Sequence, residues 1–248
     1  MTERQQVDGE PAFVLHTRDY RETSQLVDVF SRHYGRLRVV ARGSRRRKGG
    51  GRNLEPFVPL VASWCGKGEL KTLTSAEPSG LPLMLRGDCL YSGFYLNELI
   101  LRLLADHDPH QPLFDSYLEA LRHLSAGEGI EPALRCFERQ LLSELGYGLA
   151  LGHTADTGET VSPEAWYWFD PLVGVSSSTP GVSATTPQQN RFRGRELLAV
   201  EAGDYGDAEK AKAAKRLLRL AIHNLLGGRS LRSRELFIRE RLQNQEPQ

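Results

Sequence analysis

Residues 36–53, RLRVVARGSRRRKGGGRN, place eight basic side chains in eighteen residues, with no acidic side chain among them. Such a stretch suits binding of a polyanion, because each phosphate that a cation neutralises releases condensed counterions. A solvated loop and a targeting signal are the other interpretations that the stretch by itself leaves open. The rest of the chain decides among them.

Strand alternation orders the first half of this stretch. Leu37, Val39 and Ala41 fall on one face and are predicted to point into a core. The opposite face then presents arginines, and the glycine-rich segment after it adds further cations. The predicted polyanion surface consists of Arg36, Arg38, Arg42, Arg45, Arg46, Arg47, Lys48 and Arg52, with Tyr34 as the best candidate for an exposed stacking ring.

Motifs for catalysis are absent from the sequence. It contains no phosphate-binding G-x-x-x-x-G-K-[ST], no G-x-S-x-G and no H-E-x-x-H. His107 and His110 flank Asp108 in a polar turn, and a hydrolase that uses them with Asp106 and a metal is one alternative to keep. The three cysteines lack the close spacing of a zinc site. The prediction is a protein without enzymatic activity, cofactor or metal.

Charge is segregated along the chain. Residues 1–80 have a net charge of +5, residues 81–188 of −9 and residues 189–248 of +5. A second basic surface is predicted in the last segment, made of Lys210, Lys212, Lys215, Arg216 and Arg219. Two basic ends could share one polyanion, although segregated solvated charge would give the same pattern. The scattered cysteines, together with the lack of a long apolar run, favour a cytoplasmic protein without a membrane segment.

Short β-strands are predicted in the first 80 residues. Five stretches rich in Val, Leu, Phe, Thr and Trp lie at residues 12–17, 24–31, 35–43, 57–65 and 68–76, separated by turn residues. Five strands without an intervening helix indicate a small closed barrel. An OB-fold is the first candidate and an SH3-like barrel the second.

Helical periodicity begins after residue 80 and predicts an α-helical domain over residues 81–248. Leu90, Phe94, Asn97 and Leu101 recur at helical spacing. Further helices are predicted at residues 111–125, 131–145, 206–226 and 233–243, the last with Ser233 as its N-cap. Residues 150–190 are rich in Ser, Thr, Gly and Pro and predict an inserted irregular module with one β-hairpin. The expected fold class is therefore α+β.

Three stretches in this order resemble the RecO family of bacterial recombinational-repair mediators. The opening AFVLHTRDYRETSQLVDVFSRHYGRLRVVARGSRR is similar to the start of that family. ALRCFERQLLSELGYGLAL resembles its central helix, which ends in "FE..LL..LGY", and LGGRSLRSRELF resembles its C-terminal "LG...L.SR". The resemblance extends over nearly the whole chain.

This resemblance implies an N-terminal OB-fold in residues 1–80, a helical domain and a small inserted module. It also implies a non-enzymatic role on single- and double-stranded DNA. Members anneal complementary strands and act with RecR to load RecA onto strands coated by single-strand-binding protein. The bacterial cytoplasm, in association with the nucleoid, is the implied location.

Some residues can be matched to these roles. The basic stretch on the barrel would be the DNA surface, and Arg135 and Arg139 on the central helix would receive the acidic tail of single-strand-binding protein. Ion pairs with Glu131 or Glu138 on the same helix are the alternative for these two arginines. Many members carry paired cysteines as a zinc module after the central helix, whereas residues 150–190 contain none. We therefore expect no structural zinc there.

Two further classes remain open on the residues themselves. An OB barrel with basic loops does not by itself distinguish DNA from RNA, so an RNA-binding protein of translation or ribosome assembly is the main alternative. A protein-interaction scaffold with incidental charge is another. Competition between matched DNA and RNA strands would distinguish a DNA-binding protein from an RNA-binding one. Negligible binding to either strand at physiological salt would indicate the scaffold.

Overall fold

The computed structural model describes residues 5–44, 54–177 and 190–243, and it has the predicted α+β fold. The chain forms two compact units, residues 1–130 with 231–248, and residues 131–230. These units do not test the predicted domain division at residue 80, which stays a prediction. The basic loop predicted from Arg45, Arg46, Arg47, Lys48 and Arg52 lies outside the described residues.

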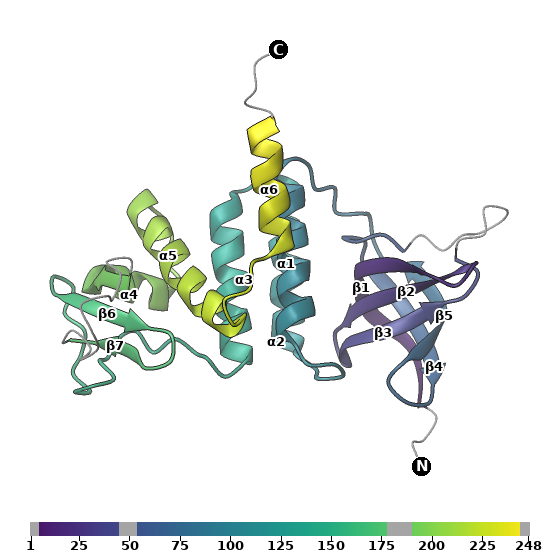
Figure 1. Ribbon diagram of the computed structural model, residues 1–248, viewed down its shortest axis with the longest axis horizontal. Helices are drawn as coiled ribbons and strands as arrows, with labels where there is room; N and C mark the ends of the chain where they lie inside the picture. The colour runs from purple at the N-terminus through teal and green to yellow at the C-terminus, as the bar shows by residue number, and fades with distance from the viewer. Residues whose placement is uncertain (1–4, 45–53, 178–189, 244–248) are drawn as a thin grey trace. The chain divides into compact units, whose positions relative to one another are not determined.

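A five-stranded barrel begins the first unit (Figure 1). Its strands are β1 Gln5–Tyr20, β2 Ser24–Ser31, β3 Gly35–Ala41, β4 Leu60–Gly66 and β5 Lys71–Pro78. They follow the order β1-β2-β3-β5-β4, and β4 pairs back with β1. The pairs are antiparallel except for the short parallel contact of β3 with β5. This is the strand order of an OB-fold, so that prediction is confirmed over the SH3-like alternative.

Strand β1 is longer than the predicted residues 12–17, because it serves two neighbours. Its first part pairs with β4 and its second part with β2, with register shifts between Val7 and Glu10 and between Val14 and His16. Gly9, at φ 70°, sits in the first shift and donates its N–H to the Ser63 hydroxyl. Glycine and proline in this region weaken the strand pattern, and only pairing across the barrel reveals the strand.

The barrel core follows the predicted alternation of β3. Leu37, Val39 and Ala41 are each 1% exposed or less, and Trp64 of β4 is fully buried among the same residues. Burying an aliphatic side chain of this kind contributes about 1.5–3 kcal/mol relative to leaving it in water. The pattern therefore fixes which face of β3 points outward.

Helices α1, Asp88–Leu103, and α2, Gln111–Ala126, lie beside the barrel in the same unit (Figure 1). Phe13 and Phe30, on the outside of β1 and β2, pack against the rings of Phe114 and Tyr117 at centroid distances of 5.2–6.0 Å. The amide of Asn97 donates to the backbone of β1 and its oxygen accepts from the Tyr117 hydroxyl at 2.6 Å. One side of the barrel is thus covered by helices.

Helix α6, Arg232–Gln243, packs against α1 and is held at its first turn. Glu98 of α1 accepts hydrogen bonds from the Arg232 N–H at 3.0 Å and from the Ser233 N–H at 2.8 Å, and the Ser233 hydroxyl adds a third at 2.7 Å. The first N–H groups of a helix have no partner within it, so this carboxylate supplies one. Ser233 therefore lies inside the first turn, and its prediction as the N-cap is wrong by two residues, because α6 begins at Arg232 and Leu231 precedes it.

The second unit contains α3, Ile130–Glu144, and α5, Ala208–Leu225, close to their predicted ranges. A small sheet of order β7-β6-β8 lies between them in the chain, with β6 Trp166–Asp170, β7 Gly174–Ser176 and β8 Arg191–Arg193. Strands β6 and β7 form the predicted hairpin. No helix in the described part of the chain is both long enough and apolar enough to cross a bilayer.

Helix α4, Gly194–Ala202, was not predicted from the sequence. It has only nine residues and starts directly after β8, so its apolar period is too short to stand out. Tertiary contacts define it instead. Glu196 accepts from the Arg193 N–H at 2.7 Å, and Leu197 and Val200 are buried.

Candidate nucleic-acid interface

Two barrel loops flank an open groove at one end of the OB-fold. Residues 21–23 join β1 to β2 and residues 67–70 join β4 to β5. Between these loops lies a groove of about 940 Å³, called here the loop groove, lined by Tyr20–Ser24, Val40, Arg42, Gly43 and Leu70–Thr72. OB-folds bind oligonucleotides with these two loops and the adjoining strand face. This end of the barrel is the candidate interface.

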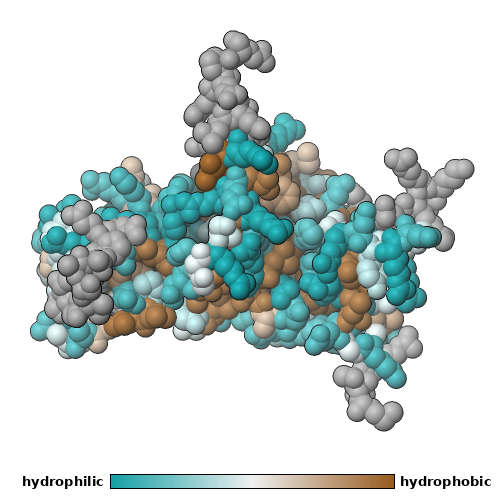
Figure 2. All heavy atoms as spheres, viewed as in Figure 1, coloured by the Kyte–Doolittle hydropathy of each residue, from teal (hydrophilic) through white to brown (hydrophobic). Residues whose placement is uncertain are grey.

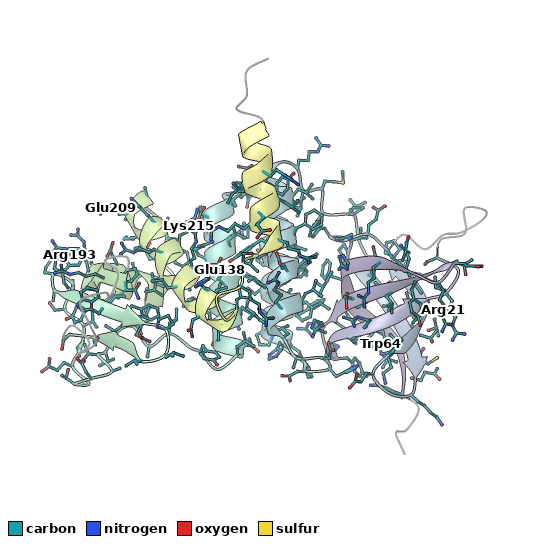
Figure 3. The ribbon with its side chains drawn as sticks, viewed as in Figure 1. Arg21, Trp64, Glu138, Arg193, Glu209 and Lys215 are labelled. Carbon is teal, nitrogen blue, oxygen red and sulfur yellow. The ribbon has the colours of Figure 1, made fainter. Side chains whose placement is uncertain are left out.

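Three basic residues line the loop groove. Arg21, at φ 56°, places its guanidinium 5.1 Å from the centroid of the Tyr20 ring, and Figure 3 shows it projecting from the barrel while Trp64 lies among the strands. Arg42 follows β3, and Lys71 begins β5 with only 6% of its surface exposed. Within the described ranges, no carboxylate forms an ion pair with any of the three. Arg21 and Arg42 are exposed, so their charge is available to a ligand, whereas Lys71 is almost fully buried and the exposed Glu22 also lines the groove.

Arg21 and Lys71 were missed from the sequence. Each is a single basic residue near a turn, and Glu22 or Glu69 stands close by, so no local charge pattern marks them. The barrel brings them together because the β1–β2 and β4–β5 loops meet at the same end. In Figure 2, the visible surface of the barrel is mainly hydrophilic, with a smaller hydrophobic area between the hydrophilic residues.

Arg36 lies at the opposite end of β3, and its contacts are internal. Its Nε and Nη2 donate to the Leu104 carbonyl at 3.2 and 3.1 Å, and Nη2 is 2.8 Å from an Asp106 carboxylate oxygen. The side chain is 14% exposed. A Cβ added to Gly35, at φ 66°, would lie 2.0 Å from the Asp108 carbonyl oxygen, so only glycine allows this approach. Arg36 thus ties the α1–α2 connection to the barrel.

Arg38, two residues further along β3, is also paired. Its Nε donates to Asp28 of β2 at 2.8 Å, and the ring of His16 is 3.8 Å from the other oxygen of the same carboxylate. Asp28 is only 8% exposed at its side chain, whereas Arg38 is 41% exposed. The predicted outward face of β3 is confirmed, but Arg36 and Arg38 on it both have carboxylate partners, and only Arg42, directly after the strand, has none among the described residues.

Tyr34 is half-buried. Its ring meets Trp64 edge to face at a centroid distance of 5.6 Å and packs against the barrel core. It lines a second, smaller hollow of about 310 Å³ together with His33, His107 and Lys71. A base could reach only the remaining exposed part of the ring, and a stacking role for Tyr34 stays a prediction.

The histidines near Tyr34 have backbone and carboxylate contacts. The His107 N–H donates to the Arg36 carbonyl at 2.8 Å, and His110 is 3.4 Å from Asp108. Across the described residues, no group of three His, Cys, Asp or Glu side chains has the arrangement to hold a metal ion.

Two family models match the chain in succession. The model described as Recombination protein O N terminal matches residues 8–81, and that described as Recombination protein O C terminal matches residues 85–235. The chain belongs to the RecO family. Its curated relatives include proteins named DNA repair protein RecO from Actinobacillus succinogenes, 46% identical over 91% of this chain and 93% of the relative, and from Pseudomonas aeruginosa, 46% identical over 93% and 94%. The Haemophilus influenzae relative is 45% identical over 91% and 93%.

Membership in the RecO family establishes a role in recombinational DNA repair. The structure also gives physical reasons for two stretches that carried the resemblance. Gly146 of "LGY", two residues after the last residue of α3, adopts φ 80°, a conformation that favours glycine at a helix end. Ser233 of "L.SR" binds the Glu98 carboxylate and so attaches α6 to α1.

Arg135 and Arg139 of α3, matched to tail binding through the RecO resemblance, have partners in α3 and α4 respectively. Arg135 is 4% exposed and lies 2.9 Å from Glu138, so the alternative of a pair on the same helix is realised for this residue. Its Nε has no hydrogen-bond partner in the described structure. Arg139 donates to the Glu201 carbonyl at 2.9 Å. Tail binding by these residues stays a prediction.

The predicted second basic surface on α5 is divided among several partners. Lys210 binds Asp204 and Asp207, and its hydrogen bond to Asp204 raises the pKa of the ammonium group. Lys215, labelled in Figure 3, pairs with Glu131 of α3. Arg216 lies 3.6 Å from Glu196, and Lys212 and Arg219 are exposed.

Proposed function

We propose that the chain is a non-enzymatic, DNA-binding recombination mediator. It binds single- and double-stranded DNA, anneals complementary strands, and helps load RecA onto strands coated by single-strand-binding protein. The observation that carries the proposal is the loop groove of an OB-fold, where Arg21, Arg42 and Lys71 have no carboxylate partner among the described residues. Membership in a family of DNA repair proteins selects DNA over RNA as the polymer.

Electrostatics supply the mechanism. Cations along the groove bind phosphates without reading bases, which lowers the repulsion between two strands and leaves their bases free to pair. Residues 45–53, which follow Ser44 in the sequence, contain Arg45, Arg46, Arg47, Lys48 and Arg52. In this proposal Arg42 and the basic segment contact DNA directly. Arg38 contributes through its exposed part, and Arg36 acts by holding the barrel to the helices.

Partner roles follow from the family and belong to the same proposal. The chain acts with RecR and with single-strand-binding protein on bacterial chromosomal DNA in the cytoplasm. The acidic tail of the binding protein would dock on the helical region near Arg135 and Arg139. Because Arg135 is buried, tail binding at that residue requires exchange of its Glu138 partner, whereas Arg139 is exposed.

The decisive experiment is annealing of two complementary strands coated with single-strand-binding protein, followed by fluorescence across a salt series. We expect annealing that weakens steeply with salt and depends little on base sequence. Absence of annealing together with absence of DNA binding at low salt would refute the proposal. If a matched RNA strand binds more strongly than the DNA strand in competition, the polymer bound by the chain would be RNA instead of DNA.

The groove is tested by the double variant Arg21→Ala with Arg42→Ala. Losing two phosphate contacts should lower single-strand affinity about 25-fold at 0.1 M salt and reduce the salt slope by about 1.4. Arg122→Ala is the matched control, because this arginine is 60% exposed on α2 and pairs with exposed Glu119. An unchanged salt slope in the double variant would remove the groove from the proposal. The fourfold Ala variant of residues 45–48 tests the basic segment in the same assay.

A further inference from the structure

The small sheet of the second unit presents an unusual outer face. Strands β6 and β8 pair with Trp166 opposite Arg193 and Trp168 opposite Arg191. Alternation places Tyr167 and Phe192 on the other face, where they are 6% and 0% exposed. Two tryptophans and two arginines therefore share the outward face, and Trp166 is 43% exposed. None of these four residues belongs to the barrel interface.

The two arginines converge on one indole ring. The guanidinium carbons of Arg191 and Arg193 each lie 4.6 Å from the Trp166 ring centroid. Cation–π attraction between each guanidinium and the ring favours this arrangement. Bringing two like charges to one ring raises their mutual repulsion, which an anionic ligand would relieve.

The surrounding charge is positive. Arg195 is exposed on the neighbouring helix α4, and Arg216 of α5 packs on Phe192, behind the outward face. In the described part of the chain, the carboxylates within ion-pair distance of these four arginines are Glu164, 3.8 Å from Arg193 and 76% exposed, and Glu196, 3.6 Å from Arg216. Residues 178–189, which connect β7 to β8, contain no acidic residue in their sequence.

Strand β8 is held firmly from the helix side. Arg216 of α5 places its guanidinium 4.0 Å from the Phe192 ring centroid and donates to the Arg191 carbonyl at 3.0 Å. Arg193, labelled in Figure 3, donates through Nη1 to the Glu164 carbonyl at 3.0 Å. A Cβ on Gly194 would lie 1.9 Å from the Ser162 carbonyl oxygen, so the turn after β8 is tightly packed. The platform is thus built on regular elements rather than on a loop.

We propose that Trp166, Arg191 and Arg193, the Trp–Arg platform, form a second contact site for single-stranded DNA. Unpaired bases extend the stack of indole and guanidinium planes, while the same guanidinium groups bind phosphates. Duplex DNA does not expose base faces, so the stacking part is specific for single strands. The inference rests on the proposed function, because it assumes that the chain binds DNA at all.

The test uses the full chain and labelled oligo(dT), with a duplex of equal length as the second probe. Trp166→Leu removes the ring and should weaken oligo(dT) binding about fivefold or more, the loss expected for one base–aromatic stack, with the salt slope and duplex affinity unchanged. Trp166→Phe keeps a ring and should recover part of that affinity. Thermal melting and near-ultraviolet circular dichroism check that both variants are folded.

The arginines are tested by the double variant Arg191→Gln with Arg193→Gln. It should weaken oligo(dT) binding about 25-fold at 0.1 M salt and lower the salt slope by about 1.4. The matched control is Arg122→Gln with Arg229→Gln, which removes the same charge at two exposed positions outside the platform.

Each outcome separates this inference from the proposed function. If wild type binds no DNA, the proposed function fails and the platform with it. If wild type binds and the Arg21 and Arg42 variant is weakened, but folded platform variants bind oligo(dT) as wild type does, only the platform is refuted. Binding of an acidic peptide to the platform without any effect of its variants on oligo(dT) would assign the surface to protein and likewise overturn the proposal.

Discussion

Strands β3 and β8 both place arginines two residues apart on an outward face, yet the two pairs have different partners. On β3, Arg36 and Arg38 meet the carboxylates of Asp106 and Asp28. On β8, Arg191 and Arg193 meet the Trp166 ring, and the only carboxylate within ion-pair distance of them among the described residues is the exposed Glu164, 3.8 Å from Arg193. A carboxylate neutralises a guanidinium, whereas an aromatic ring orients it and leaves its charge in place. The number of arginines on a strand therefore does not measure its capacity to bind a polyanion.

Arg36→Gln gives the largest expected effect and would separate architecture from binding on β3. It removes the ion pair and leaves the Leu104 carbonyl without its two donors, so the free energy of unfolding should fall by about 1–3 kcal/mol. Arg42→Gln should change it by less than about 0.5 kcal/mol. Urea denaturation of both variants measures the contrast. Equal stability would contradict a structural role for Arg36.

Glu98 can be compared with Asp28 and Asp106, which bind arginines, because its own partners are mainly N–H and hydroxyl groups. Burial opposes its ionisation, but hydrogen bonds from Ser233 and Arg232 and the charge of Arg102 together lower the pKa of Glu98 below its usual 4.5. A lowered folded-state pKa stabilises the fold above pH 4.5, and this stability is lost as the pH falls through the folded-state pKa.

Glu98→Gln tests how the Glu98 carboxylate contributes to stability. The variant should lose about 0.5–2 kcal/mol of unfolding free energy at pH 7, the range for losing a helix cap. Its stability should also fall less steeply than that of wild type when the pH drops below 4.5. Urea denaturation over pH 3–7 gives both quantities, and parallel pH profiles would show that Glu98 does not titrate as described.

Asp28→Asn would remove the carboxylate charge beside Arg38 and so make the surroundings of this β3 arginine more like those of the β8 arginines. Asparagine keeps the shape and can still accept from Arg38, but it no longer neutralises the guanidinium. Single-strand affinity should therefore rise about fivefold at 0.1 M salt, with the salt slope steeper by about 0.7. Fluorescence anisotropy with oligo(dT) measures both. A weaker or unchanged affinity in a folded variant would show that Arg38 does not reach the strand.

Arg122→Ala gives the smallest expected effect and calibrates the others. Its pair with Glu119 is exposed on both sides, so stability should change by less than about 0.5 kcal/mol. DNA affinity should stay within about twofold of wild type. A larger loss of affinity would mean that overall charge, rather than position on β3 or β8, determines binding.

Much of the fold could be predicted from local patterns. Alternation identified the core face of β3, and helical periodicity located α1, α2, α3 and α5. Elements whose stability comes from distant contacts escaped prediction. Helix α4 depends on Glu196 and on buried Leu197, and the first half of β1 depends on pairing with β4.

The candidate sites were less predictable than the fold. The density of arginine drew attention to residues 36–53, whereas Arg21 and Lys71 join Arg42 only through the barrel. Trp166 and Arg193 lie 27 positions apart in the sequence, and β-sheet register makes them neighbours. Spacing in sequence carries no signal for such pairs, because cross-strand neighbours depend on pairing and not on periodicity.

The sequence by itself determined the α+β class, the RecO family and the face of β3 on which its arginines lie, because these depend on periodicity and on motifs within short segments. Only the tertiary structure decided which of these arginines have a carboxylate at hydrogen-bonding distance. Asp28, Asp106 and Trp166 come from other segments of the chain. Whether a guanidinium meets a carboxylate or a ring is settled when folding brings those segments into contact.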